Sequence, residues 1–394
     1  MAISKKMNEF AKSASWIRKM FEEGARLKKE FGAENVFDFS LGNPDLPPPG
    51  AFQKTLIQLV ENDAPGSHAY MPNSGYPFVR EAVAASISKE QGVSLTASEM
   101  LMTCGAAGGL NVTLKALLDP GDEVIILAPF FVEYKFYVDN HGGVSKVVDT
   151  DSNFDLDLEK IAASVNQKTK AIIINSPNNP TGQIYSKESL AELGRVLGEA
   201  ERKYSSTIFL IADEPYRKIV FDNNEVPSIM QAYHNSIVVS SYSKDLSLPG
   251  ERIGFVALHP EIVEKAPLIE ALTLANRILG FVNAPALMQR VVAKLQGASV
   301  DNAIYTRRRE KFCKILAEAG YHFMPPKGAF YIFPKSPIAD DAEFVGLLQQ
   351  QKILAVPGRG FGSPGYFRLA FCVDDAVIER SAEAFKKAMA GVKE

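Results

Sequence analysis

Cysteine is scarce in this sequence. The 394 residues contain three, Cys104, Cys313 and Cys372, and these lie far apart. Such a scatter fits neither a disulfide framework nor the paired spacing of a zinc site. We therefore expect reduced thiols and no bound metal, as in a cytoplasmic protein.

Blocks of one charge and long apolar runs are also missing. The 43 basic and 46 acidic residues are interspersed and give a formal net charge of -3, which favours neither a nucleic-acid partner nor an anionic membrane. No stretch approaches the roughly 18 uncharged apolar residues of a membrane span, and no apolar run of signal-peptide length follows Lys5 and Lys6. We expect a cytoplasmic protein without membrane spans.

The length of the chain predicts more than one domain, because 394 residues exceed the usual size of a single compact unit. The segment Gly42–Gly50 is rich in proline and reads as an irregular connector between domains. We predict a large domain over residues 48–285 and a small C-terminal domain over residues 286–394, which the N-terminal residues 1–47 join.

The middle of the chain alternates short β-branched runs with helical segments, which is typical of a parallel sheet built from strand–helix units. The predicted strands are Glu123–Leu127, Ala171–Asn175, Thr207–Ala212, Ile237–Ser240 and Ile253–Ala257. Because these runs are almost entirely apolar, we expect helices on both faces of the sheet. The predicted class of the large domain is α/β, with a mostly parallel central sheet flanked by helices.

The two ends of the chain show a different pattern. Residues 8–31 have helical spacing of apolar positions, and a long helical stretch is predicted from about residue 285 to Glu318. Short runs at Phe330–Phe333 and Tyr366–Phe371 follow. These elements predict a smaller α+β domain.

Polar residues follow directly after three of the predicted strands. Asn175–Gly182 reads NSPNNPTG, Asp213–Tyr216 reads DEPY and Ser240–Lys244 reads SSYSK. Ligands of open parallel sheets bind at the carboxyl ends of the strands. One ligand is therefore expected to contact all three segments.

A glycine-rich helix start offers a site for phosphate. Gly105, Ala106 and Ala107 open a predicted helix whose free N–H groups suit an anion, although tight helix packing explains such glycines equally well. Ser241, Ser243 and Arg252 supply further donors if the turn at residues 249–250 brings the arginine back.

Asp213 and Lys244 carry the chemistry of the predicted site. A carboxylate at the end of an apolar strand needs a cation, and a protonated pyridine nitrogen is one candidate. A lysine amine becomes a nucleophile when burial or nearby positive charge lowers its pKa. Taken singly, Asp213 also reads as a helix cap and Lys244 as a surface lysine, so the inference depends on their combination.

With these motifs, the sequence resembles the class I and II aminotransferases, which are pyridoxal-phosphate enzymes of fold type I. The similarity extends from about Asp38 to Cys372 and includes NNPTG, DEPY and SYSK followed by Arg252-Ile-Gly. The resemblance implies a large domain that binds pyridoxal 5'-phosphate and a homodimer with shared active sites. It implies transfer of an amino group between an L-amino acid and a 2-oxo acid through a Schiff base on Lys244.

The resemblance also implies a role for each motif residue. Lys244 carries the cofactor and moves the proton, Asp213 keeps the pyridine nitrogen protonated, and Asn179 and Tyr216 bind the phenolic oxygen. The phosphate is held by the amides of Gly105, Ala106 and Ala107 and by the side chains of Ser241, Ser243 and Arg252. Phe131 stacks on the ring, or packs in the core as an ordinary aromatic residue.

Substrate and dimer contacts follow in the same way. Arg368 in FRLAF matches the arginine that binds the substrate α-carboxylate, with Gly42 assisting. Tyr70 matches a tyrosine that reaches the cofactor phosphate of the neighbouring subunit, although simple packing is the alternative. The segment Phe281–Ala284 lies where the family also contributes across the dimer.

Three positions bear on which amino acid is the substrate. Ala107 stands where one aspartate-using group has a lysine that reads the distal carboxylate, so aspartate specificity is in doubt. Arg277 and Arg359 are alternative readers of an acidic side chain, or they lie on a solvated helix face and cap a loop. The same scaffold also supports C–S and other β-lyases and decarboxylases, which remain the alternative to transamination. A regulator is not favoured, because the part that resembles aminotransferases begins within about forty residues of the start.

Overall fold

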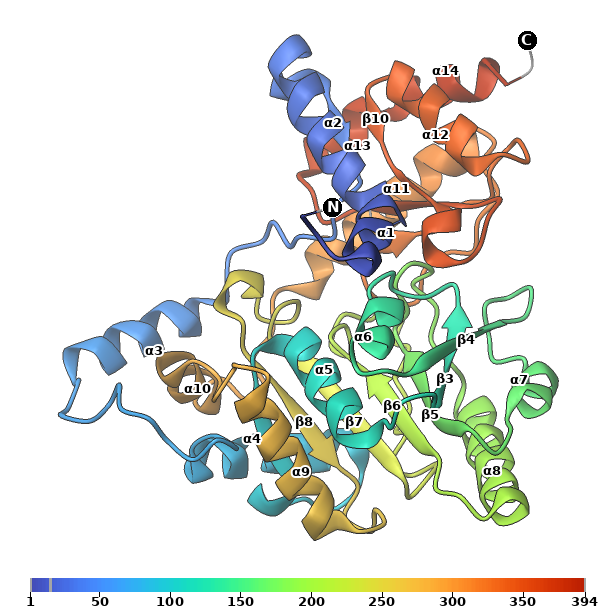
Figure 1. Cartoon of the computed structure of the whole chain (residues 1–394). Helices are drawn as coiled ribbons and strands as arrows, with labels where there is room; N and C mark the ends of the chain where they lie inside the picture. Colours follow the sequence, from blue (N-terminus) through green and yellow to red (C-terminus); the bar gives the residue numbers. More distant parts are fainter. Residues whose placement is uncertain (1, 14–15, 393–394) are drawn as a thin grey trace.

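The large domain is built on a sheet of seven strands. The computed structural model describes residues 2–13 and 16–392. The strands are β2 Met100–Thr103, β3 Glu123–Ala128, β4 Val144–Asp149, β5 Thr169–Asn175, β6 Phe209–Asp213, β7 Ser236–Ser241 and β8 Gly254–Leu258. Their order across the sheet is β2-β8-β7-β6-β5-β3-β4 (Figure 1).

The sheet is mixed rather than fully parallel. The five predicted runs all form strands, but β8 pairs antiparallel with both β7 and β2. As a result, the start of β8 lies at the same edge as the carboxyl ends of the other strands. The sequence prediction missed β2, which is only four residues long, and β4, an edge strand with several exposed positions.

Helices cover both faces of this sheet, which explains the apolar strands. The core on one face includes residues of α4 Pro77–Gln91, α7 Leu158–Ser164, α8 Lys187–Tyr204 and α10 Ala286–Ala293. The core on the other face includes residues of α5 Gly105–Leu117, α6 Tyr134–Asn140 and α9 Lys265–Ile278 (Figure 1). The α/β class predicted for this domain is confirmed.

A smaller domain holds the C-terminal part of the chain. It has a three-stranded antiparallel sheet of β11 Val356–Pro357, β12 Phe367–Ala370 and β9 Tyr331–Ile332, with helices α11 Asn302–Glu318, α12 Asp341–Gln350, α13 Asp375–Arg380 and α14 Ala382–Ala390. β1 Phe37–Asp38 pairs in parallel with β10 Ile353–Leu354, so the N-terminal segment adds to this domain. Short 3-10 helices occur at Ala33–Asn35, Ala97–Glu99, Pro249–Glu251 and Gly358–Phe361.

Two predicted helices are divided in the structure. The predicted helical segment 8–31 overlaps α1 Lys5–Ser13, which begins before it, and includes α2 Trp16–Phe31; residues 14–15 lie outside the described part of the chain. The long helix predicted to end at Glu318 is α10 followed by α11, because Gly297 takes a left-handed φ of 85° and Asp301 caps the start of α11. The domain boundaries stay a prediction, although α10 packs in the core of the large domain and favours a boundary near residue 300.

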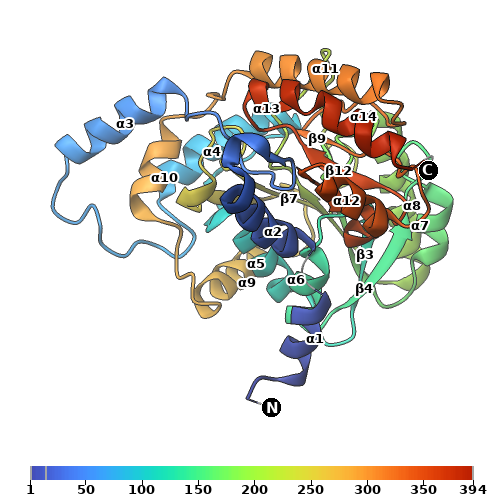
Figure 2. The ribbon, with the colours of Figure 1, turned by 90° about the horizontal axis from the view of Figure 1, so that it is seen from above.

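One part of the large domain projects from its body. Helix α3 Gly50–Glu61 and the segment after it extend outward beside α10 and α4 (Figures 1 and 2). Thr55 and Leu59 are the buried residues of α3, whereas Ile57 and Val60 are exposed. In the described part of the chain, no helix has both the length and the apolar character needed to cross a membrane.

Candidate active site

A cavity of about 290 Å³ opens at the carboxyl ends of the central strands. All the predicted site residues except Gly105 and Tyr70 line it, namely Gly42, Ala106, Ala107, Phe131, Asn179, Asp213, Tyr216, Ser241, Ser243, Lys244, Arg252 and Arg368. The lining also includes Leu41, Leu110, Tyr137, Asn175, Pro215, Pro249 and Tyr331. Segments separated by more than 300 residues in sequence therefore meet in one place.

Asp213 ends β6 and is almost fully buried. Its Oδ2 accepts a hydrogen bond of 2.6 Å from the Tyr134 hydroxyl, and its Oδ1 has no hydrogen-bond partner among the described residues. Burial raises the pKa of Asp213 to about 7, against the opposing effect of the Tyr134 hydrogen bond. A buried carboxylate of this kind is stabilised by a cationic N–H donor.

Lys244 lies on the turn after β7, at the same edge of the sheet. Its Nζ donates a hydrogen bond of 2.8 Å to the Gly42 carbonyl. Burial lowers the pKa of Lys244 to about 8, and the positive charges of Arg368 and Arg252 act in the same direction. A larger fraction of the amine is therefore neutral near neutral pH than in a solvent-exposed lysine, and the neutral amine is the form that attacks a carbonyl.

The start of helix α5 forms the anion-binding end of the cavity. Arg252 reaches it because β8 runs antiparallel, and its Nη1 donates to the Pro249 carbonyl at 2.9 Å. A Cβ at Gly105 would lie 2.8 Å from Arg252 Nη2, so glycine is needed for this close approach, and its φ of 71° also favours glycine. Together with Ser241 and Ser243, these groups suit a phosphate.

Arg368 reaches the cavity from β12 of the small domain. Its Nη1 donates to Asn179 Oδ1 at 3.1 Å, and its Nη2 donates to the Ser40 carbonyl. The guanidinium lies 4.7 Å from the ring centre of Tyr331 and 4.9 Å from that of Phe361, and its Nε has no partner among the described residues. A buried arginine with a free donor fits a carboxylate ligand.

Sequence reasoning missed two tyrosines of this site. Tyr134 binds Asp213, and the Tyr331 hydroxyl lies 2.9 Å from the Tyr216 hydroxyl. Tyr134 follows the APFF motif, and Tyr331 lies in the aromatic run Phe330–Phe333, which predicted only a structural element. Nothing in the local sequence distinguishes either residue from a core aromatic, because each acts through a contact that only the fold creates.

Three other candidates lie outside the cavity. Tyr70 is 90% exposed, on the segment that follows α3. Arg277 is exposed on α9, whereas Arg359 donates to Asp341 Oδ1 at 2.8 Å and also pairs with Asp340. Arg359 therefore connects the 3-10 helix Gly358–Phe361, which precedes β12, to the start of α12. The described residues contain no cluster of three or more metal ligands.

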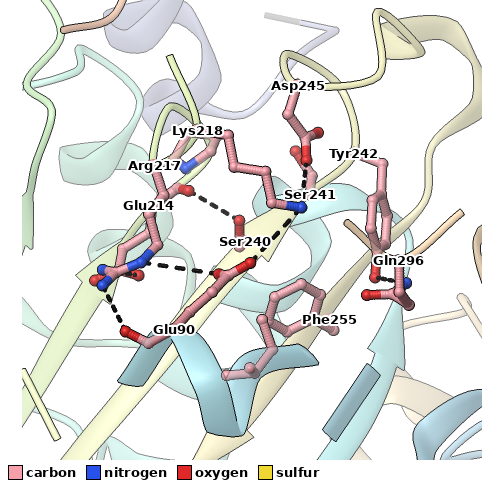
Figure 3. A pocket seen from close by; sticks show the side chains of 12 residues that line it. Glu90, Glu214, Arg217, Lys218, Ser240, Ser241, Tyr242, Asp245, Phe255 and Gln296 are labelled. Carbon is pink, nitrogen blue, oxygen red and sulfur yellow. Dashed lines mark hydrogen bonds and ion pairs between the residues drawn. The ribbon is translucent and has the colours of Figure 1, made fainter. Parts of the chain in front are cut away.

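A network of buried charges lies behind the cavity. Figure 3 shows the Lys218 amine between Asp245 and Glu90, at 3.2 and 3.6 Å, and Arg217 beside Glu214 at 3.0 Å. These ion pairs join the turn after β6, which carries Tyr216, to α4 and to the turn after β7. The ion pairs therefore connect the segments that carry Tyr216 and Lys244.

The comparisons with known proteins agree with this geometry. The aminotransferase class I and II family matches residues 34–385. A probable aspartate aminotransferase of Methanocaldococcus jannaschii is 32% identical over 361 residues, which cover 90% of this chain and 93% of that protein. A probable aspartate/prephenate aminotransferase of Aquifex aeolicus is 32% identical over 372 residues, which cover 90% of this chain and 91% of that protein.

Solved structures give the same result. The structure of an amino transferase from Eubacterium rectale has a TM-score of 0.96 at 38% identity and covers 100% of both chains. Aspartate aminotransferase from Thermus thermophilus with maleate has a TM-score of 0.85 at 26% identity, covering 95% of this chain and 96% of that one. The fold and the site define an aminotransferase, and this chain belongs to the class I and II aminotransferase family.

The charged network predicts a pH-dependent loss of stability in Lys218→Met. Removing the amine leaves the buried Asp245 carboxylate unpaired, and we expect a loss of about 3 kcal/mol in unfolding free energy at alkaline pH, where the carboxylate is ionised in both proteins. Burial raises the pKa of Asp245 to about 6 even with Lys218 opposing it, so the pKa of Asp245 should lie higher still in the variant. As the pH falls toward 6, the folded variant therefore takes up a proton that the folded native protein does not, and the deficit should shrink; below pH 6 both folded proteins are protonated and the deficit should stay constant.

Urea denaturation of both proteins from about pH 9 to 5 measures this difference, because the window in which only the variant is protonated lies above the native pKa of about 6. Lys386→Met is the matched control, because Lys386 pairs with Glu383 on an exposed helix surface and should show no measurable change. A deficit that stays constant over the whole pH range would contradict the assigned role of Asp245.

Proposed function

We propose that this aminotransferase moves an amino group between an L-amino acid and a 2-oxo acid by means of pyridoxal 5'-phosphate carried on Lys244. The observation that supports this most directly is that the unpaired buried Oδ1 of Asp213 and the amine of Lys244 line the same cavity. The class I and II family uses this cofactor. Its protonated pyridine ring withdraws electrons from the bonds at the substrate α-carbon.

The residues of the cavity fit the cofactor from end to end. Asp213 would accept a hydrogen bond from the pyridine nitrogen with its free Oδ1, and Phe131 would cover one face of the ring. Asn179 and Tyr216 would donate to the phenolic oxygen. The phosphate would be bound by the amides of Ala106 and Ala107 and by Ser241, Ser243 and Arg252, while Gly105 makes room for the arginine.

Lys244 would then act twice. Its partly neutral amine would hold the cofactor through its aldehyde carbon, and once the substrate amine had taken its place there the free lysine would accept a proton from the substrate α-carbon. The Gly42 carbonyl accepts a hydrogen bond of 2.8 Å from this amine. Arg368 would grip the substrate carboxylate and so direct the α C–H bond toward the amine.

A homodimer is supported by the projecting arm. Ile57, Val60 and Phe78 are 48%, 59% and 53% exposed, and Leu274 and Ile278 of α9 add 48% and 58%. Apolar side chains exposed in this number favour a protein interface. Since Tyr70 lies on the same arm, we propose that it reaches the phosphate end of the cavity in a second copy of the chain.

The names of the relatives do not establish which amino acid is the amino donor of this protein. Lys244, Arg252 and Arg368 are the cations among the described residues that line the cavity, and each has a role at the cofactor or the α-carboxylate. Ala107 adds no charge, and Arg277 and Arg359 lie elsewhere. The aspartate in the names of the relatives is therefore not carried over to this chain.

Lys244→Ala tests the proposal directly. We expect the variant to bind pyridoxal phosphate noncovalently, through Asp213 and the phosphate site, but to transfer no amino group. Native protein reduced with borohydride should carry the cofactor on Lys244, as measured by peptide mass spectrometry. Lys187→Ala is the control, because this exposed lysine should leave activity unchanged. Turnover by Lys244→Ala at the native rate, or an adduct on another lysine, would refute the assignment.

Substitution of Arg368 should separate the substrate site from the cofactor site. Loss of two charge-assisted hydrogen bonds is expected to raise KM for the amino acid about 100-fold in Arg368→Leu, from about 3 kcal/mol of binding. The KM of Arg368→Lys should lie between those of the native protein and Arg368→Leu, because lysine keeps the charge but cannot bind a carboxylate in the bidentate geometry. Cofactor content, read from the visible absorption, should stay native. If Arg368→Leu lost the bound cofactor as well as its affinity for the amino acid, the assignment of Arg368 to the substrate site alone would be contradicted.

Hybrid dimers test the position of Tyr70. Lys244→Ala and Tyr70→Ala are expected to be inactive and impaired, respectively, as separate homodimers. If Tyr70 acts across the interface, a dimer of one chain of each kind contains one fully native site, so the hybrid purified after coexpression should have about half of the native activity. If Tyr70 serves its own chain, both sites of the hybrid stay defective and no activity is regained.

A further inference from the structure

Tyr331 joins the large and small domains inside the cavity. It begins β9 of the small domain, is 2% exposed, and places its hydroxyl 2.9 Å from the Tyr216 hydroxyl of the large domain. A Cβ at position 42 would lie 1.9 Å from the same hydroxyl, so the Gly42 backbone closes its other side. The hydroxyl of Tyr331 is therefore held in one position.

The role proposed for Tyr216 sets the direction of its hydrogen bond with Tyr331. The 2.9 Å contact by itself allows either hydroxyl to donate. Burial raises the pKa of Tyr331 to about 12 and that of Tyr216 further, so both phenols keep their protons near neutral pH. When Tyr216 donates its proton to the phenolic oxygen of the cofactor, its own oxygen can only accept, and Tyr331 is then the donor.

We propose that Tyr331 is a positioning residue, which acts on the phenolic oxygen of the cofactor through Tyr216. This inference rests on the proposed function. A phenol that accepts a hydrogen bond is a stronger donor, since chains of hydrogen bonds polarise one another. Tyr331 thus strengthens the hydrogen bond from Tyr216 and stabilises the negative charge on the phenolic oxygen. It thereby lowers the pKa at which the cofactor linked to Lys244 loses its proton.

The ring of Tyr331 has a second, separable effect. It lies 4.7 Å from the Arg368 guanidinium, which we assign to the substrate carboxylate. Phenylalanine at this position would keep the ring and lose the hydroxyl, whereas leucine would lose both. The two substitutions therefore distinguish the effect on the cofactor from the effect on the substrate.

Tyr331→Phe in the holoenzyme is the decisive variant. A pH titration of the visible absorption without substrate should give a pKa about half to one unit above that of the native protein, from one weakened hydrogen bond. KM for the amino acid should change less than about twofold, whereas in Tyr331→Leu it should rise about fivefold with the loss of the ring contact. Asp213, Arg368 and Cys372, the other titratable groups that act on the pair, keep their places in both variants.

A double-mutant cycle with Tyr216→Phe tests the route of the effect. Tyr216→Phe should raise the same pKa by at least as much, and adding Tyr331→Phe to it should cause no further shift. An unchanged pKa in Tyr331→Phe, or a full additional shift in the double variant, would overturn the inference. Absence of visible absorption and of a borohydride adduct in the native protein would instead refute the proposed function itself.

Discussion

The structure of this site depends on one costly interaction, the burial of the Asp213 carboxylate at the end of a central strand. Six of the seven strands end at the same edge of the sheet, and helices exclude water from both faces. One oxygen of Asp213 is satisfied by Tyr134, and the other has no partner among the described residues. Such a group destabilises the fold unless a cation binds it. The burial of Asp213 therefore lowers the stability of the fold in the absence of a ligand and favours the binding of a cationic N–H donor, such as the pyridine nitrogen of the proposed cofactor.

The antiparallel direction of β8 brings a cation to the proposed phosphate end of the site. A phosphate at the start of α5 needs a cation, but a strand that ran parallel to β7 would begin at the opposite edge of the sheet. Since β8 is antiparallel, Arg252 precedes it at the cavity and approaches Gly105 closely. The short connection between Lys244 and Arg252 is thus sufficient to place an amine and a guanidinium at two ends of one ligand.

The sequence was informative where function depends on residues close together in the chain. Asn179, Asp213, Tyr216 and Lys244 follow apolar strands directly, so the rule for parallel sheets placed them at one edge. The sequence was uninformative where the site depends on the direction of a strand or on a contact between residues far apart in the chain. Neither the direction of β8 nor the break between α10 and α11 has a strong local signal, and the missed tyrosines act across 79 and 115 residues. Twelve predicted residues share the cavity, whereas their proposed roles await the experiments above.

Two hydrogen bonds inside the cavity connect the small domain to the large domain. Arg368 and Tyr331 lie on adjacent strands of the small domain and meet Asn179 and Tyr216 of the large domain through hydrogen bonds of 3.1 and 2.9 Å. With the roles proposed above, a displacement of the small domain would change the carboxylate site at Arg368 and the surroundings of the phenolic oxygen together. A carboxylate bound correctly at Arg368 would then also fix the Tyr331–Tyr216 contact. Binding energy from the substrate carboxylate would in this way position the proposed cofactor for proton transfer.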